Sequence, residues 1–323
     1  MRLRANLSGD VALVVTTLIW GSTFVTAKDI LAYWPPIAYL TFRFALAALV
    51  LCVLFGRDVW RAQRDVWRAG LILGLLVGGG FALQAAGQVY TTASKSAFVT
   101  GLTTPLVPFV AYALLRARPS LENLIGVVLA SVGGALILLP RGTESINQGD
   151  LLTLASIILF AAHITLVSRY ARRYEIRQLT VLQITTAAVI FLCVWASAQL
   201  GTRVVPATTL PQFLARETVA LVWSARVLWQ LVYLALVATL GAFFLWTWGQ
   251  ARMSATHAAI IFSLEPVFAT AFAVAVRGAS EALGARGYVG AALVFTGIIV
   301  SELRWTTATR GRSVIVESKQ GSD

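Results

Sequence analysis

The stretch that decides the fold is Gly9–Phe24, GDVALVVTTLIWGSTF, because Gly149–Ile164, GDLLTLASIILFAAHI, repeats its plan 140 residues later. At the same offset, Arg43 in the next apolar segment aligns with Gln183. Each copy holds five apolar segments. Because five is odd, the second copy must cross a membrane in the opposite sense to the first, which is the organisation of transporters built from inverted repeats.

The bulk composition also indicates a membrane protein. The 323 residues are 58% hydrophobic and only 12% charged, with a mean hydropathy of +0.78, whereas soluble domains carry about 25% charged residues. Spans of about 20 residues each are expected at 11–31, 36–55, 69–89, 93–115, 121–139, 151–170, 178–200, 228–249, 254–276 and 285–303. The remainder leaves no room for a nucleotide-binding or catalytic soluble domain.

We therefore expect an all-α membrane protein with ten transmembrane helices in two inverted five-helix repeats (5+5). The first repeat covers 10–140 and the second covers 150–303. A basic cytoplasmic tail is expected at 304–323.

The net charge of +12 would suggest a nucleic-acid partner in a soluble protein, but its distribution follows the predicted topology. Of the 26 Lys and Arg residues, 17 fall on the termini and on the connections of one side, and seven fall on the other side. This bias places both termini in the cytoplasm. We expect a multi-pass protein of the bacterial inner membrane, with membrane lipids rather than nucleic acid as partners of the basic residues.

Two connections are longer than the rest. Gly56–Arg68 holds two Asp-Val-Trp-Arg units seven residues apart, which predicts a short interfacial helix with Trp60 and Trp67 on one face. The external stretch Gly201–Arg226 is the longest loop. It would lie on the membrane surface or cover the external mouth, and its role stays open.

Glu265 is the acid that the predicted spans place deepest. It lies about 15 Å into span nine, near the middle of a hydrocarbon core about 30 Å thick, and Pro266 directly after it predicts a kink. Burial disfavours the charged carboxylate unless a cation such as Arg43 or His163 is near. Glu265 is therefore the candidate proton-coupling residue, with a structural ion pair as the alternative.

Two basic residues are further candidates within the spans. The guanidinium of Arg43, about 10 Å from the external face, stays charged and must pair or face a wet cavity, where it could attract a substrate carboxylate. His163 lies near the middle of span six, either as a satisfied hydrogen-bonding residue or as part of the pathway. Lys95 and His257 lie near span ends and are expected at the interface.

Aromatic, amide and hydroxyl residues at matching depths predict an amphipathic cavity, which suits small, partly apolar organic solutes better than bare ions. The alternative for each is packing in the core or against lipid. The candidates are Trp20, Ser22, Thr23, Phe24, Phe81, Gln84, Thr100, Thr103, Thr104, Phe160, Gln183, Phe244 and Trp246.

Several catalytic motifs do not occur in the sequence. It has no Gly-x-x-x-x-Gly-Lys-Ser/Thr loop, no His-Glu-x-x-His pair and no Gly-x-Ser-x-Gly elbow. We therefore expect no catalytic residues, no cofactor, no metal and no enzymatic activity.

The chain resembles the EamA-like ten-span family of the drug/metabolite transporter (DMT) superfamily over about residues 10–303. The resemblance rests on Leu18–Phe24, Arg43-Phe44, Ser254–Ala259, Leu264–Pro266 and the glycines of span ten. It implies a basket-shaped fold with a central cavity between two helical bundles and with spans five and ten at the periphery. It also implies export of amino acids, other metabolites, nucleobases or toxic organic compounds.

The first repeat departs from the family pattern at two places. Thr104-Pro105 stands where the second repeat has Glu265-Pro266, so Pro105 is a second predicted kink without the acid. The connection Arg116–Pro119 also lacks the acidic residue that often follows span four. Two equivalent functional carboxylates are therefore not expected.

The leading prediction is a secondary active transporter that exports small organic metabolites, such as amino acids or related compounds, by alternating access. Protons are the candidate coupling ion. A passive facilitator, a lipid scramblase and an intramembrane enzyme remain alternatives; the enzyme is disfavoured because no nucleophile and base converge. Substrate identity, the direction of transport, the coupling ion and the choice between monomer and dimer stay open at this point.

Overall fold

The computed structural model describes residues 7–116, 118–138, 147–171, 173–206, 215–243, 245–246, 261–262 and 264–302. Within these ranges the chain is helical and contains no strand. The first half holds α1 (Leu7–Ile30), α2 (Pro36–Trp60), α3 (Arg64–Gln88), α4 (Ala93–Gly101), α5 (Thr103–Leu115) and α6 (Leu121–Leu138). The second half holds α7 (Gln148–Tyr170), α8 (Ile176–Val204), α10 (Ala225–Val232), the π-helix η2 (Tyr233–Gly241), α13 (Glu265–Arg277), the 3₁₀ turn η3 (Gly278–Glu281) and α14 (Gly284–Glu302).

These helices agree with the predicted spans. Seven of them are long and apolar enough to cross a membrane, with α4 and α5 counted together as one span over Ala93–Leu115. Shorter apolar helices cover Leu121–Ile137 and Ala225–Gly241, at the places of predicted spans five and eight. Of predicted span nine, residues 261–262 and 264–276 are described, the latter mostly within α13. Residues 254–260, with His257, lie outside the described ranges, as do Phe244 and the tail.

Helix starts follow local chemistry. Helix α2 begins at Pro36, whose fixed φ suits the first turn and whose missing N–H would be unpaired there in any case. Helix α7 begins with a capping box, in which the side chain of Asn147 accepts from the backbone N–H of Asp150 and the Asp150 carboxylate accepts from that of Asn147. The proline and the capping box therefore define where α2 and α7 begin.

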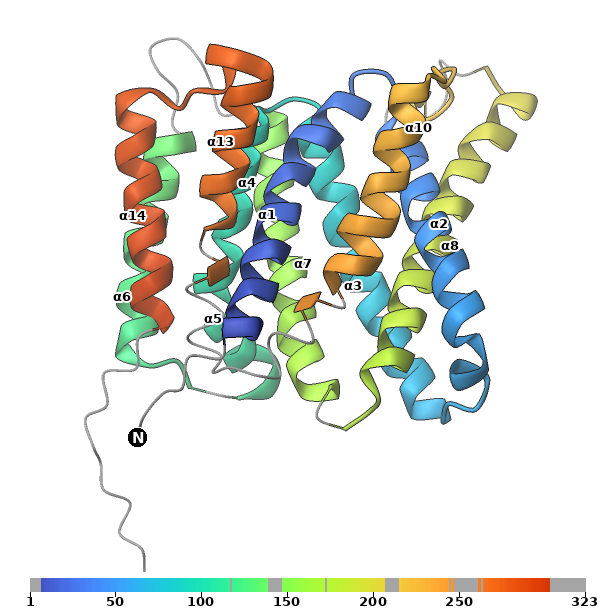
Figure 1. Cartoon of the computed structure of the whole chain (residues 1–323), viewed down its shortest axis with the longest axis horizontal. Helices are drawn as coiled ribbons and strands as arrows, with labels where there is room; N and C mark the ends of the chain where they lie inside the picture. Colours follow the sequence, from blue (N-terminus) through green and yellow to red (C-terminus); the bar gives the residue numbers. More distant parts are fainter. Residues whose placement is uncertain are drawn as a thin grey trace, which may run out of the picture.

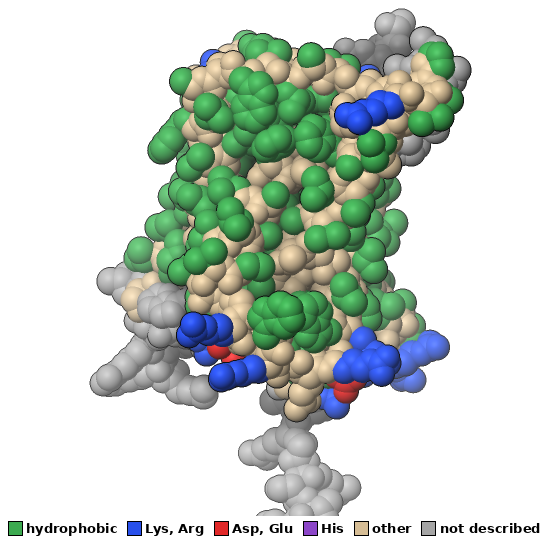
Figure 2. Space-filling model, turned by 90° about the vertical axis from the view of Figure 1, so that its right-hand side faces the viewer, with side chains coloured by type: hydrophobic (Ala, Val, Ile, Leu, Met, Phe, Trp, Pro, Cys, Tyr) green, Lys and Arg blue, Asp and Glu red, His purple; other side chains and the backbone are tan. Residues whose placement is uncertain are grey.

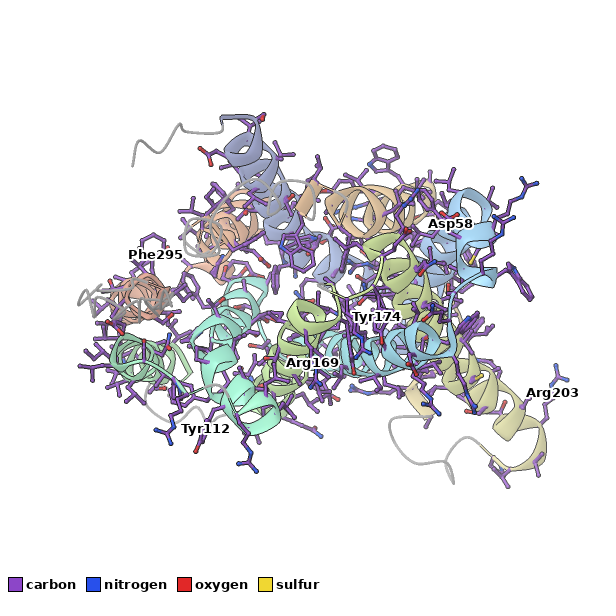
Figure 3. The ribbon with its side chains drawn as sticks, turned by 90° about the horizontal axis from the view of Figure 1, so that it is seen from below. Asp58, Tyr112, Arg169, Tyr174, Arg203 and Phe295 are labelled. Carbon is purple, nitrogen blue, oxygen red and sulfur yellow. The ribbon has the colours of Figure 1, made fainter. Side chains whose placement is uncertain are left out.

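The helices stand side by side in an elongated bundle (Figure 1). Helices α6 and α14 form one edge and α2 and α8 form the other, with α1, α3, α4, α7 and α13 between them. We call the face where α1 begins and α14 ends the terminal face, which is the lower one in Figure 1. Seen from that face, Phe295 of α14 lies at one end of the molecule and Arg203 of α8 lies at the other (Figure 3).

Glycines bring α6 and α14 into backbone contact. A Cβ atom on Gly133 would lie 2.4 Å from the carbonyl oxygen of Gly290, and one on Gly297 would lie 2.6 Å from that of Gly126. Any larger side chain would force the two helices apart. Small residues at such crossings allow the close approach that stabilises helix pairs in lipid.

The outer surface is apolar over most of its height. Figure 2 shows hydrophobic side chains covering the face formed by α2 and α8, with Lys and Arg side chains gathered along its lower edge. Exposed residues of this face include Leu49, Val53, Val189 and Leu192. A soluble monomer does not expose a contiguous apolar surface of this extent, so this surface is the one that faces lipid.

The predicted interfacial helix over Gly56–Arg68 is wrong. Helix α2 continues to Trp60 and α3 already begins at Arg64, so the two tryptophans belong to different helices. The second Asp-Val-Trp-Arg unit starts α3 because Asp65 lies in its first turn, where a negative charge interacts favourably with the helix dipole. Asp58, near the end of α2 (Figure 3), accepts a hydrogen bond from Gln178 through its backbone carbonyl.

Candidate transport cavity

A cavity of about 420 Å³ lies within the bundle and is lined by residues of both halves. Of the predicted pathway residues that the structure describes, all except Ser22 and Gln183 line it, and so does the predicted kink residue Pro266. These residues are Trp20, Thr23, Phe24, Arg43, Phe81, Gln84, Thr100, Thr103, Thr104, Phe160, His163, Trp246 and Glu265.

Ser22 and Gln183 do not line the cavity. The hydroxyl of Ser22 lies 2.6 Å from the hydroxyl of Tyr233 and thereby joins α1 to η2. Gln183 is buried, and its Oε1 lies 2.7 Å from Nε2 of His163. Gln183 therefore orients a lining residue instead of lining the cavity itself.

Arg43 is buried, with 5% of its surface exposed, and its polar partners are neutral. Its Nε donates to Oγ1 of Thr239 at 3.0 Å, and its Nη1 donates to the hydroxyl of Tyr39 at 2.9 Å. Among the described residues no carboxylate forms an ion pair with it. Arg43 therefore brings a positive charge to the cavity wall without a paired negative charge.

Aromatic rings complete the surroundings of Arg43. Its guanidinium carbon lies 5.1 Å from the centre of the Phe81 ring and 5.6 Å from that of Phe44. Such cation–π contacts contribute roughly 0.5–2 kcal/mol each. They hold the guanidinium in place and leave its charge available to a ligand.

The π-helix η2 positions the threonine that holds Arg43. Thr239 Oγ1 donates to the carbonyl oxygen of Leu234, five residues earlier, at 2.8 Å. In the same element the carbonyl of Ala238 accepts from Nε1 of Trp20 at 3.1 Å. π-Helical turns are rare and often occur at functional sites. Here the wide turn joins Trp20 of α1 and Arg43 of α2 to the second half.

Glu265 is the first residue of α13 and lines the cavity. It forms no ion pair within the described part of the chain. Helix α1 packs closely here, because a Cβ atom on Gly21 would lie 3.3 Å from the backbone oxygen of Glu265 and 2.9 Å from Cβ of Phe268. Arg43 and Glu265 thus share one cavity without pairing with each other.

The two predicted kink prolines lie in the first turns of new helices. Helix α4 ends at Gly101, only Leu102 separates it from α5, and Pro105 is the third residue of α5. In the second half Pro266 is the second residue of α13. Span four is therefore broken in the middle, and the amino-terminal ends of α5 and α13 both reach the cavity.

Aromatic residues form much of the remaining wall. The ring of Trp20 lies 5.7–5.9 Å from those of Phe243, Trp246 and Phe262, and Phe81 lies 5.3 Å from Phe160. Among the polar residues, Gln84 Nε2 donates to Oγ1 of Thr100 at 3.0 Å. The wall therefore combines flat apolar surfaces with a few fixed hydrogen-bonding groups.

The sequence patterns did not single out several of the residues at this site. Tyr39 was detectable, because it precedes Arg43 by four residues and so shares its helix face. Thr239 and Tyr233 gave no sequence signal, since their contacts depend on the π-helix. Phe243 and Phe262 lie in apolar runs where many positions are aromatic or aliphatic, and composition alone does not say which ones point inward.

Charged residues join the helices at the face opposite the terminal face. Asp29 of α1 forms ion pairs with Arg226 and, at 2.9 Å, with Arg277 of α13. Arg277 also lies 3.2 Å from Glu281, whose carboxylate accepts from the backbone N–H of Ser94 on α4. These contacts join α1, α4, α10 and α13 at that face.

A further ion pair, beside those of Asp29, joins the halves at the same face. Lys95, predicted at the interface, lies 2.7 Å from the carboxylate of Asp150 at the start of α7.

Within the described residues no group of three or more His, Cys, Asp or Glu side chains could hold a metal ion.

Known proteins resemble this chain over nearly its whole length. An uncharacterized transporter of Archaeoglobus fulgidus is 32% identical over 300 residues, which are 93% of this chain and 87% of that protein. The uncharacterized transporter YyaM of Bacillus subtilis is 24% identical over 305 residues, 92% of this chain and 94% of that protein. Both relatives are named as transporters.

A solved crystal structure of a protein shares the fold, with a TM-score of 0.60 at 18% sequence identity over 92% of this chain and 97% of that one. The model of the EamA-like transporter family matches the sequence twice, at residues 7–139 and 147–303. The chain therefore belongs to the EamA-like transporter family of the DMT superfamily.

Proposed function

We propose that this protein is a secondary transporter that carries small, partly apolar organic metabolites across the bacterial inner membrane. The observation that carries the proposal is the central cavity, to which α1 to α5 contribute from the first half and α7, η2, α13 and α14 from the second. A site between two halves can open to either side when the halves move against each other.

The cavity supports an organic solute over a bare ion. Its volume of about 420 Å³ falls in the range of about 300–1,000 Å³ typical of small-molecule sites. Aromatic rings around Trp20 and Phe81 provide apolar contact area, and Gln84, Thr100 and Arg43 provide directional hydrogen bonds. A bare ion would instead require a close cage of oxygen ligands.

Alternating access requires one face to open while the other closes. The ion pairs of Asp29 with Arg226 and Arg277 join α1, α10 and α13 at the face opposite the termini. We propose that this face is external and that these contacts separate when the cavity opens outward. The excess of Lys and Arg on the terminal side supports a cytoplasmic terminal face.

Glu265 is the proposed coupling residue. It lines the cavity, has no cation partner among the described residues, and is the first residue of α13. An unpaired carboxyl group at that depth can exchange a proton with the side to which the cavity is open. Coupling to a proton gradient follows from this property and would distinguish the protein from a passive facilitator.

Counterflow in proteoliposomes tests the proposal. The full chain is reconstituted and assayed with a panel of labelled metabolites, once as wild type and once with the cavity filled by Thr100→Trp. Val189→Trp, on the exposed apolar surface, is the matched control. We expect Thr100→Trp to abolish counterflow and Val189→Trp to retain it.

Equal counterflow in both variants would show that solutes do not pass through this cavity. Accumulation against a concentration gradient when a proton gradient is imposed supports secondary active transport. Equilibration without accumulation under the same conditions would show a passive facilitator, and lipid flipping without solute counterflow would show a scramblase.

A further inference from the structure

We infer that the solute is an organic carboxylate and that each carboxylate crosses together with one proton held on Glu265, so that the loaded cavity carries no net charge. This inference rests on the transport function proposed above and names its substrate class. It arises from the charges that the described residues bring to one cavity: the cation of Arg43, two helix amino termini and the carboxyl group of Glu265.

Arg43 supplies the binding group. Of its five N–H donors, one on Nε and one on Nη1 are used by Thr239 and Tyr39. Nη2 has no hydrogen-bond partner among the described residues, and the side chain is 95% buried at the cavity wall. A planar guanidinium with free donors matches the geometry of a carboxylate.

Two helix amino termini add to this positive region. Thr103 and Thr104 at the start of α5, and Glu265 at the start of α13, all line the cavity. The start of a helix carries a positive partial charge of roughly half an elementary charge. A ligand ammonium group would be repelled by these two ends and by Arg43, so the field favours an anion over an amine.

Glu265 competes with the ligand for the same positive region. In the proposed cycle Glu265 is ionised in the empty cavity, so that its charge and that of Arg43 sum to zero without an ion pair between them. When a ligand carboxylate enters, two negative charges share that region, and like charges favour protonation of one of them. Glu265 then takes one proton from the water on the open side. The net charge is zero in the empty cavity, where Arg43 and ionised Glu265 are present, and zero again in the loaded cavity, where Arg43, the ligand carboxylate and protonated Glu265 are present.

The remaining titratable groups leave this balance unchanged. Among the described lining residues His163 is the other titratable one, and its Nε2 contacts the neutral amide of Gln183, which offers no negative charge to hold a second proton. The helices packed against α13 are α1, α4 and η3. Apart from Glu265, the charged residues of α13 and of these three elements do not line the cavity. They are Asp10, Lys28, Asp29, Lys95, Arg277 and Glu281.

These charged neighbours also have partners of their own. Lys28 donates to the carbonyl oxygens of Gln88 and Val89. Lys95 pairs with Asp150, and Arg277 pairs with Asp29 and Glu281. Asp10 also has an interaction of its own. The charge balance of the cavity therefore depends on Arg43, Glu265 and the ligand.

Proton-linked binding tests the inference without requiring transport. The full chain in nanodiscs is titrated by calorimetry at pH 8 with 3-phenylpropionate, phenethylamine and phenylalanine, which share a ring and differ in charge. Each titration is repeated in two buffers of different ionisation enthalpy, so that the difference reports protons taken up. We expect 3-phenylpropionate to bind most tightly, with about one proton taken up and an affinity that falls about tenfold per pH unit above pH 8.

Variants assign the two roles. Glu265→Gln should bind 3-phenylpropionate without proton uptake and with an affinity independent of pH, whereas Glu175→Gln, an exposed carboxylate, should behave as wild type. Arg43→Gln should weaken binding at least tenfold, whereas Arg173→Gln, an exposed arginine, should not. If Glu265→Gln does not fold, the two-buffer measurement on the wild-type protein still decides whether a proton accompanies the ligand.

Three results would overturn the inference: tighter binding of the amine or of the zwitterion, no proton uptake by the wild type, or undiminished uptake in Glu265→Gln. These results differ from failure of the transport function. Counterflow of a neutral or cationic metabolite would leave the transporter intact and remove the carboxylate. Proton-linked binding without counterflow of any solute would remove the transport function instead.

Discussion

The ammonium group of Lys95 lies 2.7 Å from Oδ2 of Asp150, and this ion pair joins helix α4 of the first half to α7 of the second. Asp150 is fully buried, and its other oxygen accepts from the hydroxyl of Thr91 at 2.9 Å. The backbone N–H of Asn147 donates to the same carboxylate as part of the helix cap. One carboxylate therefore caps a helix, binds a hydroxyl and balances a cation between the halves.

Removing either partner of this pair should destabilise the protein. Lys95→Met leaves a buried carboxylate without its cation and should cost about 3–5 kcal/mol. Asp150→Asn should cost less, because Lys95 keeps 21% of its side chain exposed. The double variant should recover part of the loss in a thermal-unfolding double-mutant cycle in detergent. Additive losses would show that the two side chains are not coupled.

The carboxyl of Glu217 should make stability depend on pH. It lies between α8 and α10 and accepts from the backbone N–H groups of Ile37 and Ala38 at the start of α2, at 3.1 and 2.9 Å. Burial raises its pKa above the ordinary value of 4.5, and the two backbone hydrogen bonds and the charge of Arg216 offset only part of this effect. The folded state thus holds the proton more tightly than the unfolded one.

Stability should therefore fall as pH rises from about 4.5 through the higher pKa of the folded state. Glu217→Gln should remove this part of the pH dependence, and the exposed control Glu175→Gln should keep it. Glu217→Ala should lose about 1 kcal/mol more than Glu217→Gln, because it removes the helix cap altogether. Thermal midpoints measured in detergent between pH 4.5 and 7.5 report both effects; an unchanged slope in Glu217→Gln would assign the pH dependence to another group.

The glycine contact between α6 and α14 should be intolerant of a methyl group. In Gly133→Ala the new Cβ would lie 2.4 Å from the carbonyl oxygen of Gly290, and overpacking of this kind costs about 1–3 kcal/mol. Gly56→Ala is the matched control, because no atom lies within 4 Å of its Cβ position. The control should be neutral or stabilising by up to about 1 kcal/mol. Equal thermal stability of the two variants would mean that these helices separate without cost.

The accessibility of the two ends of α8 to a membrane-impermeant reagent tests the proposed orientation. Cys52 and Cys193 are free and are first replaced by alanine. Glu175→Cys then marks the terminal face, and Val204→Cys marks the opposite face. A membrane-impermeant maleimide should label Val204→Cys in intact cells and Glu175→Cys only after permeabilisation. Labelling in the reverse order would place the termini outside the cell.

Much of the architecture could be predicted from the sequence because spans in lipid must be long and apolar. The predicted spans at 36–55 and 178–200 fall within α2 and α8, and the predicted span at 121–139 coincides with α6 to within one residue. The repeat also predicted that Pro105 and Pro266 occupy corresponding places. The interfacial helix at Gly56–Arg68 failed, since an aromatic and basic pattern is equally compatible with the ends of two long helices.

The sequence by itself determined the number of spans, the inverted repeat and the candidate residues at the depth of the cavity, because each follows from hydrophobic length and spacing along the chain. Only the tertiary structure decided their partners. It gave Arg43 the neutral Thr239 and Tyr39 instead of Glu265, and it gave Lys95 the carboxylate of Asp150. The physical reason is that a charge in a low-dielectric bundle is stabilised by groups within a few ångströms. Apart from Tyr39, four residues before Arg43 on the same helix, those groups come from helices far apart in the chain, whose contacts no local pattern specifies.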